Sequence, residues 1–274
     1  MIKGLYTSAM GMLMQEAALT TTTNNLANVN TLSYKRDKIT YEEFPNVLEM
    51  RINDTKLSPG QKFYDAPQIG RLGTGVIVDR ITTDHEEGSI RETNIRTNFA
   101  LEGKAYLMIQ GENGVRFTRN GELLVTDDGF LETKNGEKVL GTQSNILPGT
   151  PIYEPGATLP SYIEPIRIND DINFEVNNFG MIRGSNFRFL KVVFENTNSL
   201  QKEGYNNFKL TEGQALKDDT FEIRQGFLEY SNVNVVSEMV NMIKVQRAYE
   251  ANSKILQGID DAIGQTASQL GRLR

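Results

Sequence analysis

The segment TTTTNNLANVNTLSYKR, Thr20 to Arg36, contains the change of pattern that decides the fold. Its start is typical of a helix end and its finish of a strand start, and four asparagines but no charged residue precede Lys35. A solvent-facing helix would carry Glu and Lys, whereas an apolar core would exclude amides, because burying them without partners is unfavourable. We therefore expect this segment to meet a surface that is polar but uncharged.

The residues before this segment predict a helix of modest intrinsic stability. Apolar residues from Ile2 to Leu13 recur at spacings of three and four, which is the helical period. Gly4 and Gly11 each weaken a helix by about 1 kcal/mol relative to Ala, and the run of threonines loses rotamer freedom. Such a helix needs a partner to fold against.

The C-terminal segment, 231–274, predicts a much longer helix. It contains no proline, and Asn234 is placed to cap its start. A helix of about 40 residues is about 60 Å long, so it exceeds the width of a small domain. It therefore requires the N-terminal helix, other copies of the chain, or both as partners. Its apolar stripes consist of Val236, Val240 and Ile243, and of Leu256, Ile259, Ile263, Ala267 and Leu270.

The middle of the chain, from Gly73 to Tyr230, predicts antiparallel β structure. Short apolar or alternating runs are separated by glycine-containing turns, and Asp128-Gly129 and Asn135-Gly136 are hairpin signals. Five of the eight prolines lie in 148–165, which predicts an extended loop without regular pairing. A second irregular stretch is expected at 45–70.

The predicted fold class is therefore α+β. Long N- and C-terminal helices pair as a coiled-coil-like core, and a mainly antiparallel β domain is inserted between them. We expect a discontinuous helical axial core formed by 1–34 with 231–274, an extended linker or loop region at 35–72, and a β-rich outer domain at 73–230.

Composition excludes several classes of function. The net charge of −6 and the pI of about 5.1 argue against nucleic acid, which requires a basic face. The absence of cysteine excludes disulfides and thiol chemistry. The N-terminus has no pattern of a cleaved signal peptide, and no window is long and apolar enough to insert into a membrane.

The sequence contains no positive enzymatic signal, and we predict no catalytic residue, cofactor site or metal site. His85 lies among acidic residues without metal-ligand spacing, which favours a solvated turn. The Asp127–Gly129 stretch favours a hairpin turn over a calcium loop. Two alternatives stay open: a carbohydrate-active enzyme using a carboxylate pair in the β domain, and an adaptor with a helical docking arm.

Both ends of the chain resemble one known family. NNLANVNTLSYKR (24–36) and SNVNVVSEMVNMIKVQRAYEANSKIL (231–256) resemble the two terminal motifs of the bacterial flagellar axial proteins, the rod and hook family. The stretches 86–109 and 116–141 resemble the β domain of the rod proteins. The family usually has Gly-Phe where this chain has Ser33 and Tyr34, and a common Asp is replaced by Asn234.

The resemblance implies a non-enzymatic subunit of the flagellar basal-body rod, which polymerises into a helical drive shaft and transmits torque to the hook. It implies self-assembly, contacts with other rod and hook proteins, and export into the periplasm by the flagellar type III apparatus without signal cleavage. The stretches 34–54 and 192–208 favour the proximal rod type in its spirochaete form. The stretch 72–76 is shared with the distal rod protein, which is the alternative, and a hook-like or adaptor axial protein is a more distant one.

The same resemblance, together with the periodicity of the helices, indicates the assembly interface. In a tube of identical subunits the four asparagines hydrogen-bond to backbone and to neighbours. The alternative is that they only cap and turn the helix within one subunit. The residues expected at the interface are Leu5, Asn24, Asn25, Leu26, Asn28, Asn30, Val236, Met239, Val240, Ile243, Gln246, Arg247, Tyr249, Leu256, Ile259, Ile263 and Leu270.

Overall fold

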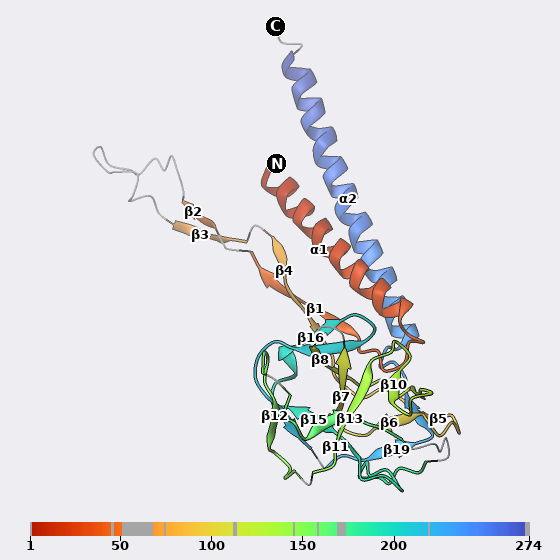
Figure 1. Ribbon diagram of the computed structural model, residues 1–274. Coiled ribbons are helices and arrows are strands. Elements are labelled where there is room, and N and C mark those ends of the chain that lie inside the picture. The colour runs from red at the N-terminus through yellow and green to blue at the C-terminus, as the bar shows by residue number, and fades with distance from the viewer. Residues whose placement is uncertain are drawn as a thin grey trace, which may run out of the picture. The chain divides into compact units, whose positions relative to one another are not determined.

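The computed structural model describes residues 2–44, 47–50, 68–73, 75–111, 114–144, 146–157, 159–168, 174–218 and 220–271 (Figure 1). The fold is α+β, as the sequence predicts, with a helix at each end and mainly antiparallel strands between them. The chain divides into two compact units. The helical unit comprises Met1–Leu26, Asp37–Thr82 and Val235–Arg274, and the β unit comprises Ala27–Arg36 and Thr83–Asn234.

The helical unit contains the two predicted helices, α1 (Ile2–Ala27) and α2 (Val235–Gly271). They pack against each other where α1 has its glycines. A Cβ placed on Gly4 would lie 3.4 Å from Cδ1 of Ile259, and one on Gly11 would lie 2.9 Å from Nδ2 of Asn252. The later residue of α1, Gly11, contacts the earlier residue of α2, Asn252, so the two helices run antiparallel. The glycines that weaken α1 thus permit the close approach of its partner.

Among its described residues, the helical unit also contains four strands. β1 (Asp37–Glu43) pairs with β4 (Val76–Thr83), and β2 (Val47–Met50) pairs with β3 (Gln68–Leu72) in antiparallel register. The prediction of an irregular stretch at 45–70 is therefore wrong at β2 and at the start of β3, while 51–67 lie outside the described residues. The prolines misled the prediction, since they flank these strands in sequence and do not interrupt them.

The β unit is built on one large antiparallel sheet of twelve strands among its described residues. Its central path runs in the order β12-β18-β15-β7-β11-β10-β9, with β8 pairing β7. The strands of this path and its branches are β7 (Tyr106–Gly111), β8 (Gly114–Thr118), β9 (Leu123–Val125), β10 (Leu131–Thr133), β11 (Lys138–Thr142), β12 (Pro151–Tyr153), β13 (Ile163–Pro165), β14 (Arg188–Phe189), β15 (Lys191–Phe194), β16 (Leu200–Glu203), β17 (Asn207–Leu210) and β18 (Ala215–Lys217).

Two short antiparallel pairs complete the β unit. β5 (Ile90–Glu92) pairs with β20 (Phe227–Glu229), and β6 (Phe99–Leu101) pairs with β19 (Ile223–Gln225). A 3₁₀ turn occupies Thr197–Ser199. Both pairs join segments from the two ends of the inserted region, so they close it into one unit.

The turn predictions and the proline prediction had different outcomes. The Asp128-Gly129 and Asn135-Gly136 turns connect β9 to β10 and β10 to β11, with both glycines at φ near 80° as such turns require. By contrast, the expectation that 148–165 has no regular pairing is wrong. β12 pairs with β18 and β13 with β11. Proline is tolerated there because Pro151 opens a strand at the end of the sheet path and Pro165 closes one.

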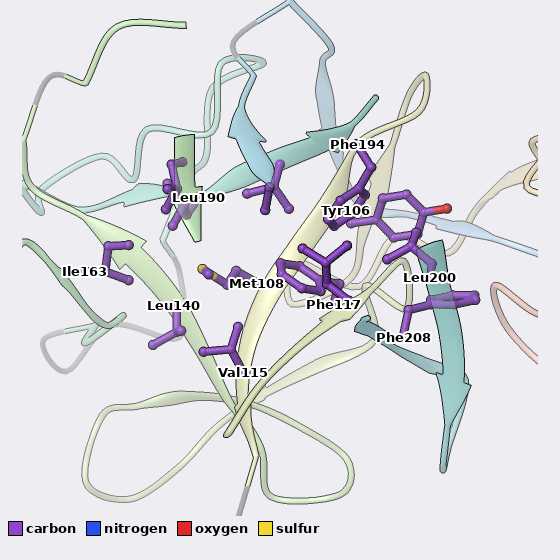
Figure 2. Close-up of a cluster of buried hydrophobic side chains, with 14 residues drawn as sticks. Tyr106, Met108, Val115, Phe117, Leu140, Ile163, Leu190, Phe194, Leu200 and Phe208 are labelled. Atoms are coloured by element: carbon purple, nitrogen blue, oxygen red, sulfur yellow. The ribbon is translucent and has the colours of Figure 1, made fainter. Parts of the chain in front are cut away.

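The core lies on both faces of β7. Tyr106 and Met108 belong to one buried apolar cluster, whereas Leu107 and Ile109 belong to a second. This division follows from the period of two along a strand, and it shows that β7 is covered on both sides. Figure 2 shows the first cluster, in which Tyr106 and its neighbours from several strands point toward one another.

Candidate functional site

The start of α2 carries an exposed apolar stripe, which we call the α2 stripe and define as Val236, Met239, Val240 and Ile243. Their exposed fractions are 71%, 48%, 44% and 52%. The spacings of three and four place them on one side of the helix. At about 100° per residue, Ile243 and Asn252 point to opposite sides of α2, so the stripe faces away from the contacts with α1.

The other predicted residues of the helices differ in their surroundings. Gln246, Arg247, Tyr249 and Ile263 are exposed, whereas Leu5, Leu26, Leu256 and Ile259 are partly buried, and Leu270 lies near the end of α2. Sequence reasoning did not assign Tyr6 and Leu13 of α1 to the interface, although they are 55% and 60% exposed. Their spacing of seven residues, which places them on one side of α1, was the signal available in the sequence.

Two of the four asparagines, Asn25 in the last turn of α1 and Asn28 just after it, make contacts within the subunit. The Asn25 side chain is 2% exposed. Its Nδ2 donates to the carbonyl oxygen of Asp37 at 2.9 Å, and its Oδ1 accepts from the Asp37 N–H at 2.9 Å. Asn28 Oδ1 accepts from Thr31 Oγ1 at 3.1 Å. Asn25 and Asn28 thus form the bonds of the intrasubunit alternative, whereas Asn24 and Asn30 are exposed.

Three charged side chains, those of Lys35, Arg119 and Glu229, are buried together. We call these three residues the ion cluster. Lys35 Nζ lies 2.6 Å from Glu229 Oε1, and Arg119 Nε lies 2.8 Å from Glu229 Oε2. All three side chains have an exposed fraction of 0%. Sequence reasoning missed this cluster, because its members are far apart in the chain.

Within the ion cluster, attraction between opposite charges opposes the effect of burial, which favours the neutral form of each group. Burial lowers the pKa of Lys35, and the nearby Arg119 lowers it further. Burial alone would raise the pKa of Glu229, but Arg119 and Lys35 more than offset this effect and hold that pKa below its ordinary value. The carboxylate is therefore ionised near neutral pH, and it provides the negative charge that both cations require.

Ser33 precedes the cluster in an unusual backbone conformation. Its φ is 55°, in the left-handed region that glycine adopts most readily. Its N–H donates to the carbonyl oxygen of Glu229 at 2.9 Å, and its Oγ donates to that of Arg119 at 2.8 Å. This backbone conformation gives a physical reason for the glycine that the axial-protein motif usually has at this position.

His85 lies beside the ion cluster in a partly buried site. Its Nδ1 and the Tyr106 hydroxyl are hydrogen-bonded at 2.6 Å, and its ring lies 5.3 Å from that of Phe208. Burial, followed by the positive charges of Lys35 and its neighbours, lowers the pKa of His85 to about 4. The prediction of a solvated turn is therefore wrong, because these aromatic rings cover the imidazole.

Comparisons with known proteins match both units. Residues 224–270 match the family described as flagellar basal body rod FlgEFG protein C-terminal, and residues 100–183 match the flagellar hook protein FlgE/F/G D1 domain. The flagellar basal-body rod protein FlgG of Borreliella burgdorferi is 31% identical over 272 residues, spanning 96% of this chain and 97% of the relative. The chain belongs to the flagellar basal-body rod protein family.

Other relatives agree along nearly the whole length. FlgG of Buchnera aphidicola subsp. Baizongia pistaciae is 29% identical, covering 96% of this chain and 98% of the relative. The flagellar hook-basal body complex protein FlhO of Bacillus subtilis is 25% identical over 100% of both chains. As a rod protein, this chain is a structural component of the flagellar basal body and not an enzyme.

The described part of this rod protein contains no group of three side chains able to hold a metal ion together. Within the same residues, neither α1 nor α2 combines the length and hydropathy that a membrane crossing requires. The α2 stripe and Glu229 lie inside the matched C-terminal region of the family, and β7 to β13 lie inside the matched D1 region.

Proposed function

We propose that this rod protein polymerises with copies of itself through the α2 stripe and forms the helical shaft of the rod. The stripe carries the proposal, because four large apolar side chains stand exposed in a row. Completely burying one such side chain contributes about 1.5–3 kcal/mol, so covering the partly exposed stripe contributes on the order of 5 kcal/mol. A neighbouring subunit of the same chain provides an apolar partner in Tyr6 and Leu13 of α1.

The contact between these two stripes is heterologous, since it joins different surfaces of two copies. Heterologous contacts that do not close into a ring build open helical filaments. In this arrangement α1 and α2 pair as a coiled-coil-like core, and their close approach at Gly4 and Gly11 supports such pairing. Residues 1–34 with 231–274 form the axial core, 35–72 an extended linker, and 73–230 the outer β-rich layer.

The assembled shaft transmits torque from the motor to the hook. Its partners are other rod and hook proteins, in keeping with family models whose descriptions cover both. Before assembly the chain passes through the flagellar type III export apparatus without signal cleavage and reaches the periplasm. The absence of cysteine suits export of an unfolded chain into an oxidising compartment.

The first test changes one residue of the α2 stripe. Ile243→Asp places a charge where the neighbouring subunit is expected, and we expect it to abolish polymerisation of the purified chain. Lys244→Asp introduces the same residue one position along, about 100° around the helix, and serves as the matched control. Sedimentation and electron microscopy measure assembly. Normal filaments from Ile243→Asp, or equal loss from both variants, would contradict the proposal.

The position within the rod is the finer part of the proposal, and the proximal segment is the one that the sequence favours. Electron cryotomography of basal bodies in a strain that lacks this chain distinguishes the possibilities. A rod that stops at its base supports the proximal position, and a rod without its outer section and hook supports the distal one. A complete rod and hook would contradict the structural role itself.

A further inference from the structure

The chain crosses between the helical unit and the β unit at four points. These points follow Leu26, Arg36, Thr82 and Asn234. On the side of the β unit they belong to three segments: 27–36, the segment that starts at Thr83, and the segment that ends at Asn234. Any force that passes along the backbone between the units must enter the β unit through these segments.

Hydrogen bonds join the first of these segments to the last. The Ser33 N–H donates to the carbonyl oxygen of Glu229 at 2.9 Å, and the Arg36 N–H donates to Asn232 Oδ1 at 2.8 Å. Lys35 Nζ adds the ion pair with Glu229 at 2.6 Å. The residues that follow α1 are thus bonded directly to those that precede α2.

The remaining segment is bonded to the same two groups. Lys35 Nζ also donates to the carbonyl oxygen of Glu86 at 2.6 Å, and the Gly88 N–H donates to Glu229 Oε1 at 2.9 Å. Gly88 fits closely here, since a Cβ on it would lie 1.8 Å from the carbonyl oxygen of Tyr230. Lys35 and Glu229 therefore bind all three segments together.

Arg119 connects this arrangement to the sheet. Its Nε donates to Glu229 Oε2 at 2.8 Å, and its Nη1 donates to the carbonyl oxygen of Gly103 at 2.6 Å. Arg119 follows β8 closely, and its side chain is completely buried. The guanidinium also donates to the carbonyl oxygen of the buried Ala105 at 3.2 Å, so it connects Glu229 to the backbone between β6 and β7.

We propose that Lys35, Arg119 and Glu229 form a mechanical lock, which carries force between the chain crossings before that force reaches the sheet. Its biological meaning rests on the proposed role in the rod, where each subunit transmits torque. While the lock holds, force applied at residues 27 and 234 passes through the bonded segments, and the chain between Gly88 and Glu229 stays outside the force path. Opening the lock separates the buried charges and leaves each of them without its partner, so rupture is costly.

The test is single-molecule force spectroscopy on the full chain in two pulling geometries. Because the chain has no cysteine, introduced cysteines give unique attachment points. Ala27→Cys with Val236→Cys loads the lock, whereas Asn135→Cys with Glu212→Cys loads turns of the β unit elsewhere. The four positions are exposed.

Lys35→Met removes the ammonium group but leaves Arg119 and Glu229 as a balanced pair. We expect this variant to shorten the lifetime under constant force by about tenfold or more when the lock is loaded, because it removes the two bonds by which Lys35 Nζ joins its own segment to Glu86 and Glu229. We expect little change in the second geometry. Glu175→Gln, which removes an exposed carboxylate that also pairs with an arginine, is the matched control and should change neither lifetime.

If Lys35→Met shortens the lifetime equally in both geometries, the cluster stabilises the fold in general and the proposal is overturned. If the variant has no effect when the lock is loaded, the proposal is also overturned. Ser33→Ala removes the bonds from Ser33 Oγ to the carbonyl oxygens of Arg119 at 2.8 Å and Glu229 at 3.4 Å. It provides a milder variant with the same directional expectation, should Lys35→Met not fold. The measurement uses single molecules, so its outcome does not depend on polymerisation. Failure of the lock and failure of the assembly proposal are thereby distinguished.

Discussion

The α2 stripe of the helical unit and the ion cluster of the β unit place their side chains in opposite ways. The helical unit exposes the apolar residues of the α2 stripe, whereas the β unit buries the charged residues of the ion cluster completely. Exposed apolar surface is stabilised only by a partner, but buried charge is satisfied by partners already present in the chain. On the proposed function, assembly covers the α2 stripe of the helical unit, whereas the ion cluster of the β unit already has its partners within the chain.

The largest expected effect tests whether the charges of the ion cluster are satisfied within the chain. Glu229→Gln removes the negative charge and leaves Lys35 and Arg119 buried together. We expect the free energy of unfolding to fall by about 3–5 kcal/mol, measured by urea denaturation. Glu175→Gln, at an exposed pair, should cost at most about 1 kcal/mol. If the two variants lost similar free energies of unfolding, the claim that the buried ion cluster contributes more than an exposed pair would be contradicted.

The next effect concerns the neutral His85. Its pKa of about 4 in the folded chain lies below its ordinary value of 6.5, so the unfolded chain binds the proton first as pH falls. Its contribution to stability is complete above about pH 6.5 and is lost between about pH 6.5 and 4, amounting to up to about 3 kcal/mol. His85→Gln removes this titration. We expect the free energy of unfolding, measured by urea denaturation, to fall more steeply between about pH 6.5 and 4 in the unmodified chain than in His85→Gln. Equal pH dependence of the two proteins would contradict the lowered pKa of His85.

A smaller effect tests the asparagine that follows the threonine run. Asn25→Ala leaves the backbone N–H and carbonyl of Asp37 without their side-chain partners. We expect a loss of about 1–3 kcal/mol in the helical unit, with little change in the β unit. Hydrogen exchange resolves the two units. If Asn25→Ala blocks polymerisation while leaving both units equally protected, the amide acts between subunits instead.

The smallest effect sharpens the account of Ser33. Ser33→Ala keeps the left-handed backbone conformation and loses the bond to Arg119, so it should cost about 1–2 kcal/mol. Ser33→Gly loses the same bond but relieves the strain, so its cost should stay below about 1 kcal/mol. Thermal unfolding of the two variants gives the comparison. A glycine variant less stable than the alanine variant would contradict the role of backbone strain.

Local patterns in the sequence predicted the local parts of the fold. The two helices and the turns at Gly129 and Gly136 follow from periods and turn residues that lie within a few positions of each other. β12 and β13 were missed because prolines at strand ends resemble prolines in loops, and periodicity in so short a strand is weak.

The candidate site was predictable in part for the same reason. The spacing of Val240 and Ile243 identifies a helix stripe, but it does not tell which side of α2 is covered by α1. The ion cluster joins residues 35, 119 and 229 through the tertiary fold, and no periodic pattern connects such distant positions. The burial of His85 likewise depends on rings contributed by β7 and β17.

The central claim is that a neighbouring subunit covers the α2 stripe in the assembled rod, and chemical labelling tests it most directly. In this cysteine-free chain, Ile243→Cys introduces a single thiol on the stripe, and Asn135→Cys provides an exposed control on the β unit. The account predicts that a maleimide labels Cys at position 243 rapidly in the free subunit and at least about tenfold more slowly in isolated rods, because burial excludes the reagent. Equal labelling of that thiol in subunit and rod would contradict the account.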